Sequence, residues 1–527
     1  MSVRRVMGTE TEYAVSSRGA GRYNPVQLSF DVVGAASDER TKHIRWDYRQ
    51  EDPVNDARGT RLERACAHPD LLTDAPQLNI TNVIAANGGR VYVDHAHPEY
   101  SAPETTDPFE AVRYDHAGDL IMRRAASKAS DITGHAIVLH RNNVDGKGAS
   151  WGTHENYTLL RAVPFEEVTR LMTAHFVSRQ IYTGSGRVGL GERSERTGYQ
   201  LSQRADYFHM KVGLQTTFDR PIINTRDESH STDEYRRLHV IVGDANRMDV
   251  PQALKLGTTS MLLWLLEHAG EAGLDLNAMM DALTLADPVE AMHTVSHDLT
   301  LNAELPLENG GTTTAWQMQV TLRGMVYAAA VMIHGSDTAG EPAWPDRSTR
   351  NIMAMWGQAL ADVAAIRHAD DDRRLGMSEQ AGRIEWLLKW RLLEKLRRKI
   401  NSDWADPRLA AVDLQWAALD PKDSIFAKLA SQTERLIGDA QLEQASTEPP
   451  SDTRAWLRAQ MIRRFPEQVV AASWSHLTVR CETSGDESVE NTMLSLDMSD
   501  PLAFGESQCS RAFEGVLDAR AVIGRLR

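Results

Sequence analysis

The stretch Arg90-Val91-Tyr92-Val93-Asp94-His95-Ala96-His97-Pro98-Glu99-Tyr100 begins as a strict alternation of polar and apolar residues. Side chains of a β-strand point to opposite faces in turn, so the two valines face a core while the arginine, tyrosine and aspartate share the other face. Pro98 is expected to end the ladder. A strand that only stabilises a core does not need that polar row, so we interpret it as the floor of a functional site.

The opening segment Arg5–Val15 also reads as a strand, with Glu10 and Glu12 on one face. Two such carboxylates lie about 6.5–7 Å apart, and a cation beside them would offset their repulsion. Hard oxygen ligands of this kind suit Mg²⁺. A solvent-facing edge strand shows the same alternation, and these residues alone slightly favour that interpretation.

The composition bounds the class of protein. The chain has 527 residues, 42% of them hydrophobic, and a formal net charge of −15. A nucleic-acid binder would need a basic surface, so we expect none. The three cysteines are odd in number and form no CxxC pair, which suits a reducing cytoplasm. No apolar run is long enough for a signal peptide or a membrane span, so we expect a cytoplasmic protein.

Segment 37–61 is dense in charge, contains Pro53 and Gly59, and shows no usable period. It reads as a long loop, and loops of this length in compact proteins are functional or disordered. Trp46 and Tyr48 are unusual in a disordered segment, so a functional loop is favoured.

Helical periodicity and caps predict the remaining organisation. Asp107-Pro108 starts a helix to about Ser127, and Pro164 opens one to about Tyr182. Later helices are expected at 252–268, 316–334, 348–367 and 384–400, the last with a basic face that is best explained as solvated. A linker is expected at 444–452, followed by a helix opening at Thr453-Arg454 and a strand over 473–480.

Several polar residues remain open on this evidence. Residues 154–156 (His-Glu-Asn) fit two interpretations, as part of a site or as residues that cap and pin a turn. Arg237 and His239 share one face of a strand, a pattern that suits phosphate or metal but is more often structural. Trp474 could stack a nucleobase, although a core position is the default. No phosphate-loop, dinucleotide or HExxH motif occurs, so any ATP must be bound through carboxylate-held metals.

Together these pieces resemble the Pup-processing family, whose fold and ATP site are like those of glutamine synthetase and glutamate–cysteine ligase. The motifs that carry the resemblance span nearly the whole chain in the family's order: residues 7–12, 90–99, 152–157, 202–206, 220–228, 236–246, 453–454 and Trp474. The resemblance implies an α+β fold. It implies a glutamine synthetase-like catalytic domain at 1–445, with a curved, mainly antiparallel sheet packed by helices, and a small C-terminal α/β domain at 446–527 that completes the nucleotide site.

Two branches of the family differ in reaction. The ligase branch typically has a DVGSHPE core, whereas this chain reads Asp94-His95-Ala96-His97-Pro98-Glu99. Segment 37–61 looks like the extra loop of the deamidase and depupylase branch. The resemblance therefore favours the hydrolase branch, with the Pup ligase as the alternative.

The same resemblance implies the roles of individual residues. Asp94 matches the catalytic aspartate. Mg²⁺ would be held by Glu10, Tyr92 and Glu99, with Glu12 and His239 as further ligands. ATP would be contacted by Arg90, Arg454 and Trp474, with Arg237 on phosphate, and with Ser101 in place of a family threonine that aligns near Ala102.

The implied reaction is hydrolysis of an amide at a glutamine side chain, with ATP as a cofactor. Asp94 could attack the carbonyl directly, or act as a general base on water or phosphate, and the residues do not choose between these. Pup, pupylated proteins and the proteasomal ATPase ring are the implied partners. Two further alternatives are a ligase acting on free amino acids and a non-catalytic nucleotide-binding adaptor.

Overall fold

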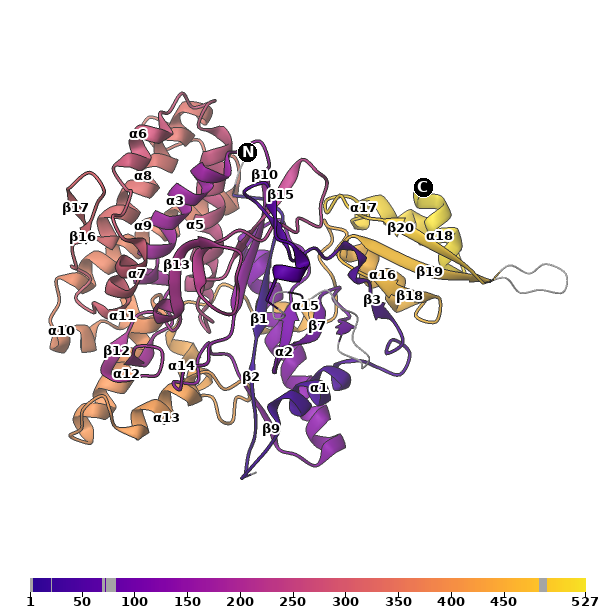
Figure 1. Cartoon of the computed structure of the whole chain (residues 1–527), viewed down its shortest axis with the longest axis horizontal. Coiled ribbons are helices and arrows are strands. Elements are labelled where there is room, and N and C mark those ends of the chain that lie inside the picture. The colour runs from indigo at the N-terminus through magenta and orange to yellow at the C-terminus, as the bar shows by residue number, and fades with distance from the viewer. Residues whose placement is uncertain (1–2, 20, 69–71, 73–81, 483–490) are drawn as a thin grey trace.

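The computed structural model describes residues 3–19, 21–68, 72, 82–482 and 491–527. Its centre is a six-stranded sheet in the order β15-β10-β1-β8-β7-β6. The strands are β15 (Tyr235–Val240), β10 (Thr153–Leu160), β1 (Met7–Glu12), β8 (His97–Ser101), β7 (Arg90–Asp94) and β6 (Asn82–Ile84). Every neighbouring pair is antiparallel, and the helices around the sheet make the fold α+β, as expected (Figure 1).

β7 and β8 form a hairpin through the two-residue turn His95-Ala96, with His95 at a φ of 50°. The expectation that Pro98 ends the ladder is wrong, because Pro98 lies inside β8 and pairs with Val93. Hydrogen-bonded and non-hydrogen-bonded pairs alternate along an antiparallel ladder. The Asp94–His97 pair next to the turn is hydrogen-bonded, so the following Val93–Pro98 pair is a non-hydrogen-bonded pair. Proline has no N–H to donate, and at this position the hairpin does not need one.

One face of β1, β7 and β8 packs on α1 (Pro25–Ala36) and α2 (Pro108–Thr133). Val91, Val93 and Tyr100 belong to that core, as the alternation of the β7 stretch predicts. α2 starts as expected, with the Asp107 side chain accepting from the Phe109 amide. It continues past Ser127 to Gly134, which adopts the left-handed conformation that ends many helices. No glycine lies between Ser127 and Gly134 to end the helix sooner.

The larger core lies between β10, β15 and a helical half (Figure 1). Here the helical periods are confirmed within a few residues: α5 (Asp249–His268), α8 (Ala315–His334), α9 (Arg347–Arg367) and α12 (Glu385–Lys399). The helix expected over 164–182 is divided at Arg179 into α3 (Phe165–Ser178) and α4 (Gln180–Thr183). On α12, Arg397 and Arg398 pair with Glu394 of the same helix.

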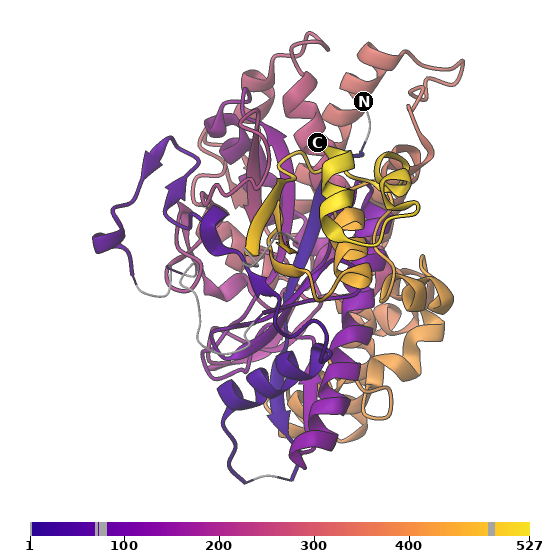
Figure 2. The same ribbon diagram turned by 90° about the vertical axis from the view of Figure 1, so that its right-hand side faces the viewer.

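A small C-terminal unit stands beside the sheet and faces the viewer in Figure 2. Its four-stranded sheet has the order β20-β19-β18-β3, with β18 (Val469–Ala472), β19 (His476–Glu482), β20 (Asn491–Asp497) and β3 (Arg45–Trp46). Helices α16 (Ala455–Arg464) and α18 (Ala519–Leu526) pack on it. β3 belongs to segment 37–61, so the N-terminal part of the chain contributes a strand to this unit.

Shorter elements complete the described residues. The strands are β2 (Ala14–Ser17), β4 (Asn55–Asp56), β5 (Thr60–Arg61), β9 (Ile137–His140), β11 (Arg187–Leu190), β12 (Arg196–Gln200), β13 (Phe208–Gly213), β14 (Arg220–Asn224), β16 (Leu305–Pro306) and β17 (Thr312–Thr313). The helices are α6 (Leu276–Asp281), α7 (Pro288–His297), α10 (Asp371–Gly376), α11 (Ser378–Ala381), α13 (Pro407–Trp416), α14 (Ile425–Leu429), α15 (Asp439–Ala445) and α17 (Glu506–Cys509). Among the residues described, no helix combines the length and apolar character needed to cross a membrane.

Candidate active site

The sheet face opposite α1 and α2 forms the floor of a cavity of about 400 Å³. Its lining comes from β1, β7, β8, β10, β15, segment 37–61, the β14–β15 connection and the C-terminal unit. Ten of the predicted site residues line it: Glu10, Arg90, Tyr92, Asp94, Glu99, Ser101, Arg237, His239, Arg454 and Trp474. Glu12 is not part of the lining, but its carboxylate lies against Asp94 and Glu99.

Strand register explains why residues so far apart in sequence meet here. Across β1 and β8, Glu12 pairs with Glu99 and Glu10 with Ser101. On its other side, Glu10 pairs with His154 of β10. Cross-strand partners on one face have Cβ atoms about 4.5–5.5 Å apart, so each row brings its polar groups into contact.

The first row ends in a cluster of three carboxylates, Glu12, Asp94 and Glu99, whose ligand oxygens lie within 4.8 Å of one another. Burial, reinforced by the charges of the neighbouring carboxylates, raises the pKa of Glu99 well above its usual value. Burial also acts to raise the pKa of Glu12, but the His97 hydrogen bond and charge outweigh it and lower that pKa to about 2. Such a donor set, made only of oxygen and crowded with negative charge, fits a divalent cation such as Mg²⁺.

A second cluster consists of Glu10, His154 and His239. His154 Nδ1 lies 3.2 Å from one Glu10 oxygen and 3.2 Å from His239 Nε2. Burial lowers the pKa of His239 well below its usual value, which keeps this imidazole neutral. Neutral ring nitrogens that converge on a carboxylate offer lone pairs to a metal ion, so this donor set also fits one.

Asp94 is the most accessible of the clustered carboxylates, with 28% of its side chain exposed. It is the last residue of β7, and His95 Nδ1 in the adjoining turn lies 3.0 Å from its Oδ1. Its position at a strand end lets the carboxylate reach a substrate that enters the cavity while Glu12 and Glu99 stay buried behind it.

Arg90 is held between two aromatic rings. Its guanidinium carbon lies 4.0 Å from the ring centroid of Trp46 and 4.1 Å from that of Tyr92. Its Nε donates to the Asn82 side chain at 2.7 Å. Stacked and hydrogen-bonded in this way, the planar fork keeps its terminal nitrogens at the cavity, which suits recognition of phosphate.

Trp474 lies in the turn between β18 and β19, since β19 begins at His476 and not at Ser473 as expected. Its ring meets that of Trp46 edge to face, with centroids 5.2 Å apart. Arg454 is buried in the wall beside it, with Nε on Glu104 at 2.7 Å and NH1 on the His230 carbonyl at 2.6 Å. At least two N–H donors of Arg454 are therefore hydrogen-bonded to other residues of the protein.

Arg237 of β15 and Ser101 of β8 lie on the sheet face that forms the floor of the cavity. Arg237 donates from Nε to the Asn156 side chain at 2.7 Å and from NH2 to Glu10 at 3.3 Å. The Ser101 hydroxyl lies 3.5 Å from the Tyr92 hydroxyl. Both side chains face the cavity.

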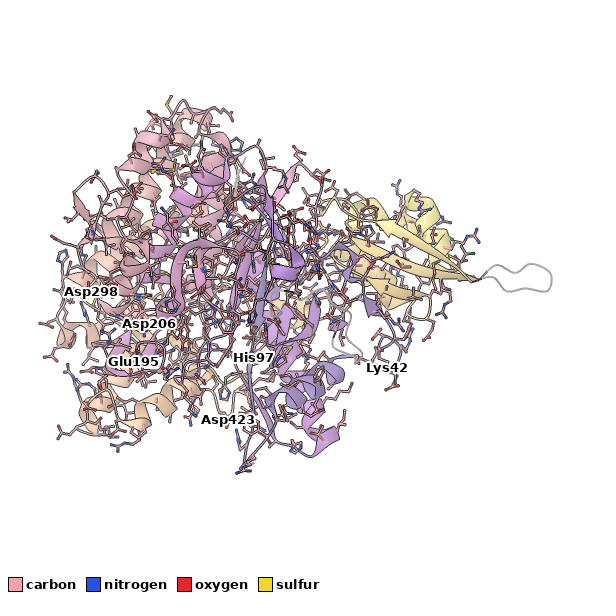
Figure 3. All side chains as sticks on the ribbon, viewed as in Figure 1. Lys42, His97, Glu195, Asp206, Asp298 and Asp423 are labelled. Carbon is pink, nitrogen blue, oxygen red and sulfur yellow. The ribbon has the colours of Figure 1, made fainter. Side chains whose placement is uncertain are left out.

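Segment 37–61, which the sequence predicts as a long loop, contains short pieces of regular structure. β3 pairs in parallel with β18, a 3-10 turn covers Tyr48–Gln50, and β4 pairs with β5. Isolated short strands carry no periodic signal, so the sequence pattern could not reveal them. Lys42 of this segment lies toward the C-terminal unit in Figure 3.

The open question of residues 154–156 is resolved by strand parity. His154 and Asn156 line the cavity, whereas Glu155 points to the opposite face and pairs with buried Arg179 at 2.6 Å. Asp206 of the predicted 202–206 motif does not line this cavity. It borders a second cavity under the helical half, near the labelled Glu195 and Asp298 (Figure 3).

The cavity also contains charged residues to which the sequence assigned no role: Glu51, Glu104, Arg226, Glu228 and His230. Glu228 accepts from the Asp52 amide at 2.5 Å and lies 3.5 Å from Arg237, so it joins segment 37–61 to the floor. The run of charged residues at 226–228 can be recognised in the sequence. The partner of each of these side chains could not be predicted, because it lies in a distant segment of the chain.

The chain is similar to known proteins over most of its length. Residues 5–478 match the family described as Pup-ligase protein. The Pup deamidase/depupylase of Mycolicibacterium smegmatis is 42% identical over 92% of this chain and 93% of its own length. The Pup–protein ligase of Micrococcus luteus is 36% identical over 75% of this chain and 83% of its own.

Two solved structures are similar. The Pup ligase PafA in complex with Pup has a TM-score of 0.75 at 26% identity, with 97% of this chain and 92% of that chain covered. PafA in complex with ADP has a TM-score of 0.68 at 29% identity, with 82% and 89% covered.

Proposed function

The chain belongs to the Pup-ligase protein family, and from this premise we propose that it is an ATP- and Mg²⁺-dependent amidohydrolase of the Pup system. It deamidates the C-terminal glutamine of Pup to glutamate and cleaves the isopeptide bond between Pup and substrate lysines. The observation that carries this assignment is the greater identity and coverage shared with a Pup deamidase/depupylase than with a Pup ligase.

Asp94 is the residue we assign to the chemistry. The scissile bond joins a glutamine side-chain carbonyl to nitrogen in both reactions. Attack by the Asp94 carboxylate on that carbonyl carbon would expel ammonia or the lysine amine, leave an anhydride, and let water restore the aspartate. As a general base, Asp94 would instead take the proton of an attacking water. Glu12 and Glu99 lie close to Asp94 but are buried, so Asp94 is the carboxylate of this cluster that a substrate can reach.

The nucleotide and metal are assigned to the same cavity. Arg90, Arg237 and Ser101 lie at the floor and Trp474 and Arg454 at the wall, so we place ATP between the sheet and the C-terminal unit. Mg²⁺ bound by Glu10, Glu12, Glu99, Tyr92 and His239 would supply positive charge to the phosphates and to the developing oxyanion. His154 joins this set because it shares Glu10 with His239.

We further propose a glutamine synthetase-like catalytic domain at 1–445 and a C-terminal domain at 446–527 that completes the nucleotide site. The structural relative solved in complex with ADP supports binding of a nucleotide by this fold. Pup and pupylated proteins are the proposed partners, with the proteasomal ATPase ring as a further one, and the cytoplasm is the proposed location.

Mass spectrometry of Gln-ended Pup before and after incubation with enzyme, ATP and Mg²⁺ tests the assignment. Conversion of the glutamine to glutamate supports the hydrolase. A matched incubation with Glu-ended Pup and a lysine-bearing protein separates the alternative, because formation of an adduct there identifies a ligase. Adduct formation without deamidation would overturn the proposal.

A further inference from the structure

A buried ion cluster joins helix α16 of the C-terminal unit to the segment that follows β8. Glu104 accepts from Arg454 Nε at 2.7 Å and from Arg458 NH1 at 3.3 Å, and its second oxygen accepts from Arg458 NH2. The side chains are 12%, 3% and 0% exposed, in the order Glu104, Arg454, Arg458. We call these three residues the α16 clamp.

The charges of the clamp depend on one another. Burial alone would raise the pKa of Glu104, but Arg458 and Arg454 outweigh it and hold that pKa at about 2. Glu104 is therefore ionised at neutral pH. Charges this deeply buried are retained only with close partners, so removal of one member leaves another uncompensated.

Arg458 reaches beyond Glu104 to two parts of the cavity wall. Its NH1 donates to the Trp474 carbonyl at 3.0 Å, and its guanidinium carbon lies 5.0 Å from the Trp474 ring centroid. Its Nε donates to the Gly88 carbonyl at 3.0 Å, two residues before Arg90. The guanidinium of Arg458 thus fixes both Trp474 in the cavity wall and the turn that leads into β7, the strand that carries Arg90.

Gly88 shows how closely these parts approach. It has a φ of 83°, and a Cβ at this position would lie 2.8 Å from the Ala455 carbonyl oxygen at the start of α16. Glycine is therefore required here both for its backbone angle and for the contact. The turn before β7 and the start of α16 are therefore in direct backbone contact.

We propose that Arg458, held by Glu104, is a positioning residue of the nucleotide site that fixes Trp474 against the strand carrying Arg90. The proposal rests on the nucleotide cofactor assigned above. Arg458 does not line the cavity, unlike Arg454 and Glu104, so it acts on a nucleotide through the residues that it orients. Such a residue affects nucleotide affinity and leaves the chemical step to Asp94.

Arg458→Gln in the full chain, compared with Arg463→Gln, tests the proposal. Arg463 lies on the same helix and pairs with Glu448, but it is 38% exposed and does not line the cavity. We expect the Kd for ADP, measured by calorimetry, to rise about tenfold in Arg458→Gln, the effect of losing hydrogen bonds to a charged group. The KM for ATP should rise in parallel, with kcat at saturating ATP nearly unchanged.

Arg458→Lys separates positioning from stability. Lysine keeps a cation beside Glu104 but cannot reach Gly88 and Trp474 at the same time. The melting temperature should therefore recover while the ADP affinity stays low. Full recovery of both would show that the charge alone is needed and would overturn the positioning role.

Glu104→Gln provides the measurement if Arg458→Gln does not fold, because the amide keeps the shape of the carboxylate. ADP affinities within about twofold of the Arg463→Gln control, in whichever of the two variants folds, would overturn the inference. Absence of ADP binding in the wild-type protein would instead overturn the assigned nucleotide cofactor. The two failures are therefore distinguishable.

Discussion

At the scale of single residues, the same kind of side chain serves different purposes according to its surroundings. Asp94, Glu12 and Glu99 lie within one cluster, yet only Asp94 has a substantially exposed carboxylate. Glu99 shares its surroundings with three other acids, which together with burial favour its protonated form in the absence of a cation. Accessibility and local charge, rather than residue type, are therefore the reasons why we propose Asp94 as the group that meets substrate.

Replacing Asp94 with asparagine should remove activity without removing the site. The amide keeps the size of the side chain but is neither a nucleophile nor a base, so we expect deamidation of Gln-ended Pup to fall by about a thousandfold or more. ADP affinity and the melting temperature should stay close to wild type. Asp439→Asn, at an aspartate that is 94% exposed, is the control. Undiminished ammonia release from Asp94→Asn would contradict the assigned role.

His140 predicts a pH effect on stability. Its pKa is lowered to about 4, chiefly because burial disfavours the charged ring. The unfolded chain, with an ordinary pKa of 6.5, then binds a proton at a higher pH than the folded protein. Stability is therefore lost as pH falls from about 6.5 toward 4, by about 2 kcal/mol between pH 7 and pH 5.

Urea unfolding at pH 7, 6 and 5 checks this effect. His140→Asn cannot take up the proton, so the loss between pH 7 and pH 5 should be smaller in this variant than in the wild type. Equal pH dependence of the two proteins would show that His140 does not contribute to it.

At the scale of elements, segment 37–61 joins the two halves of the site. β3 extends the C-terminal sheet, and Ile44 enters the core of that unit. Farther along, the Asp227 amide donates to the Asn55 carbonyl at 3.1 Å and the Ala57 amide to the Thr225 carbonyl at 2.8 Å, which attaches the segment to the β14–β15 connection. The segment thus crosses the cavity from one wall to the other.

Trp46 is the residue of this segment with the largest expected effect. It is 6% exposed, and it contacts both Arg90 and Trp474. Trp46→Ala should lower the free energy of unfolding by about 3 kcal/mol and weaken ADP binding, since it empties one side of the Arg90 stack. Tyr23→Ala, at a 45% exposed aromatic residue, is the control for urea unfolding and calorimetry. Unchanged stability would mean that β3 is not docked in solution.

The helices and strands also show which features of the fold sequence periodicity can predict and which it cannot. α8 and α9 bury one stripe over several turns, which is the pattern that the helical period detects. α5 is buried on nearly all sides, so its prediction depended on its length and apolar character rather than on a stripe. The strand expected over residues 5–15 is divided at Tyr13 into β1 and β2, which pair with different neighbours. Alternation predicts the face of a residue but not its partner strand, so that break had no signal in the sequence.

At the scale of the whole molecule, the proposed nucleotide site lies where the central sheet meets the C-terminal unit. The lining comes from both parts, and the α16 clamp, which contributes Glu104 and Arg454 to that lining, joins them. A ligand bound at such a junction stabilises the folded arrangement of both parts at once.

ADP with Mg²⁺ should therefore raise the melting temperature of the full chain. At a concentration one hundred times its Kd, a ligand contributes about 2.7 kcal/mol to the free energy of unfolding. EDTA should remove most of the shift, because the carboxylate clusters would again repel one another and the phosphates. Differential scanning calorimetry of wild type and Arg90→Gln measures it. A full shift in the presence of EDTA would argue against a metal-dependent nucleotide site.

Periodicity in the sequence predicted the long helices and the polar face of β7, and the motifs that carry the family resemblance implied the α+β class. These features depend on periodicity and on local motifs, which can be recognised in a short segment without knowing how the rest of the chain packs. Ten of the eleven residues predicted for the site line one cavity.

Only the tertiary structure decided which residues meet. It joined His154 to Glu10 and His239, attached segment 37–61 to both walls, and placed Glu104 and Arg458 behind Trp474. Each of these contacts links segments that are far apart in sequence, and strand register and burial select them. A pattern of residue types shows which side chains share a face, but the partner across that face depends on how the whole chain packs.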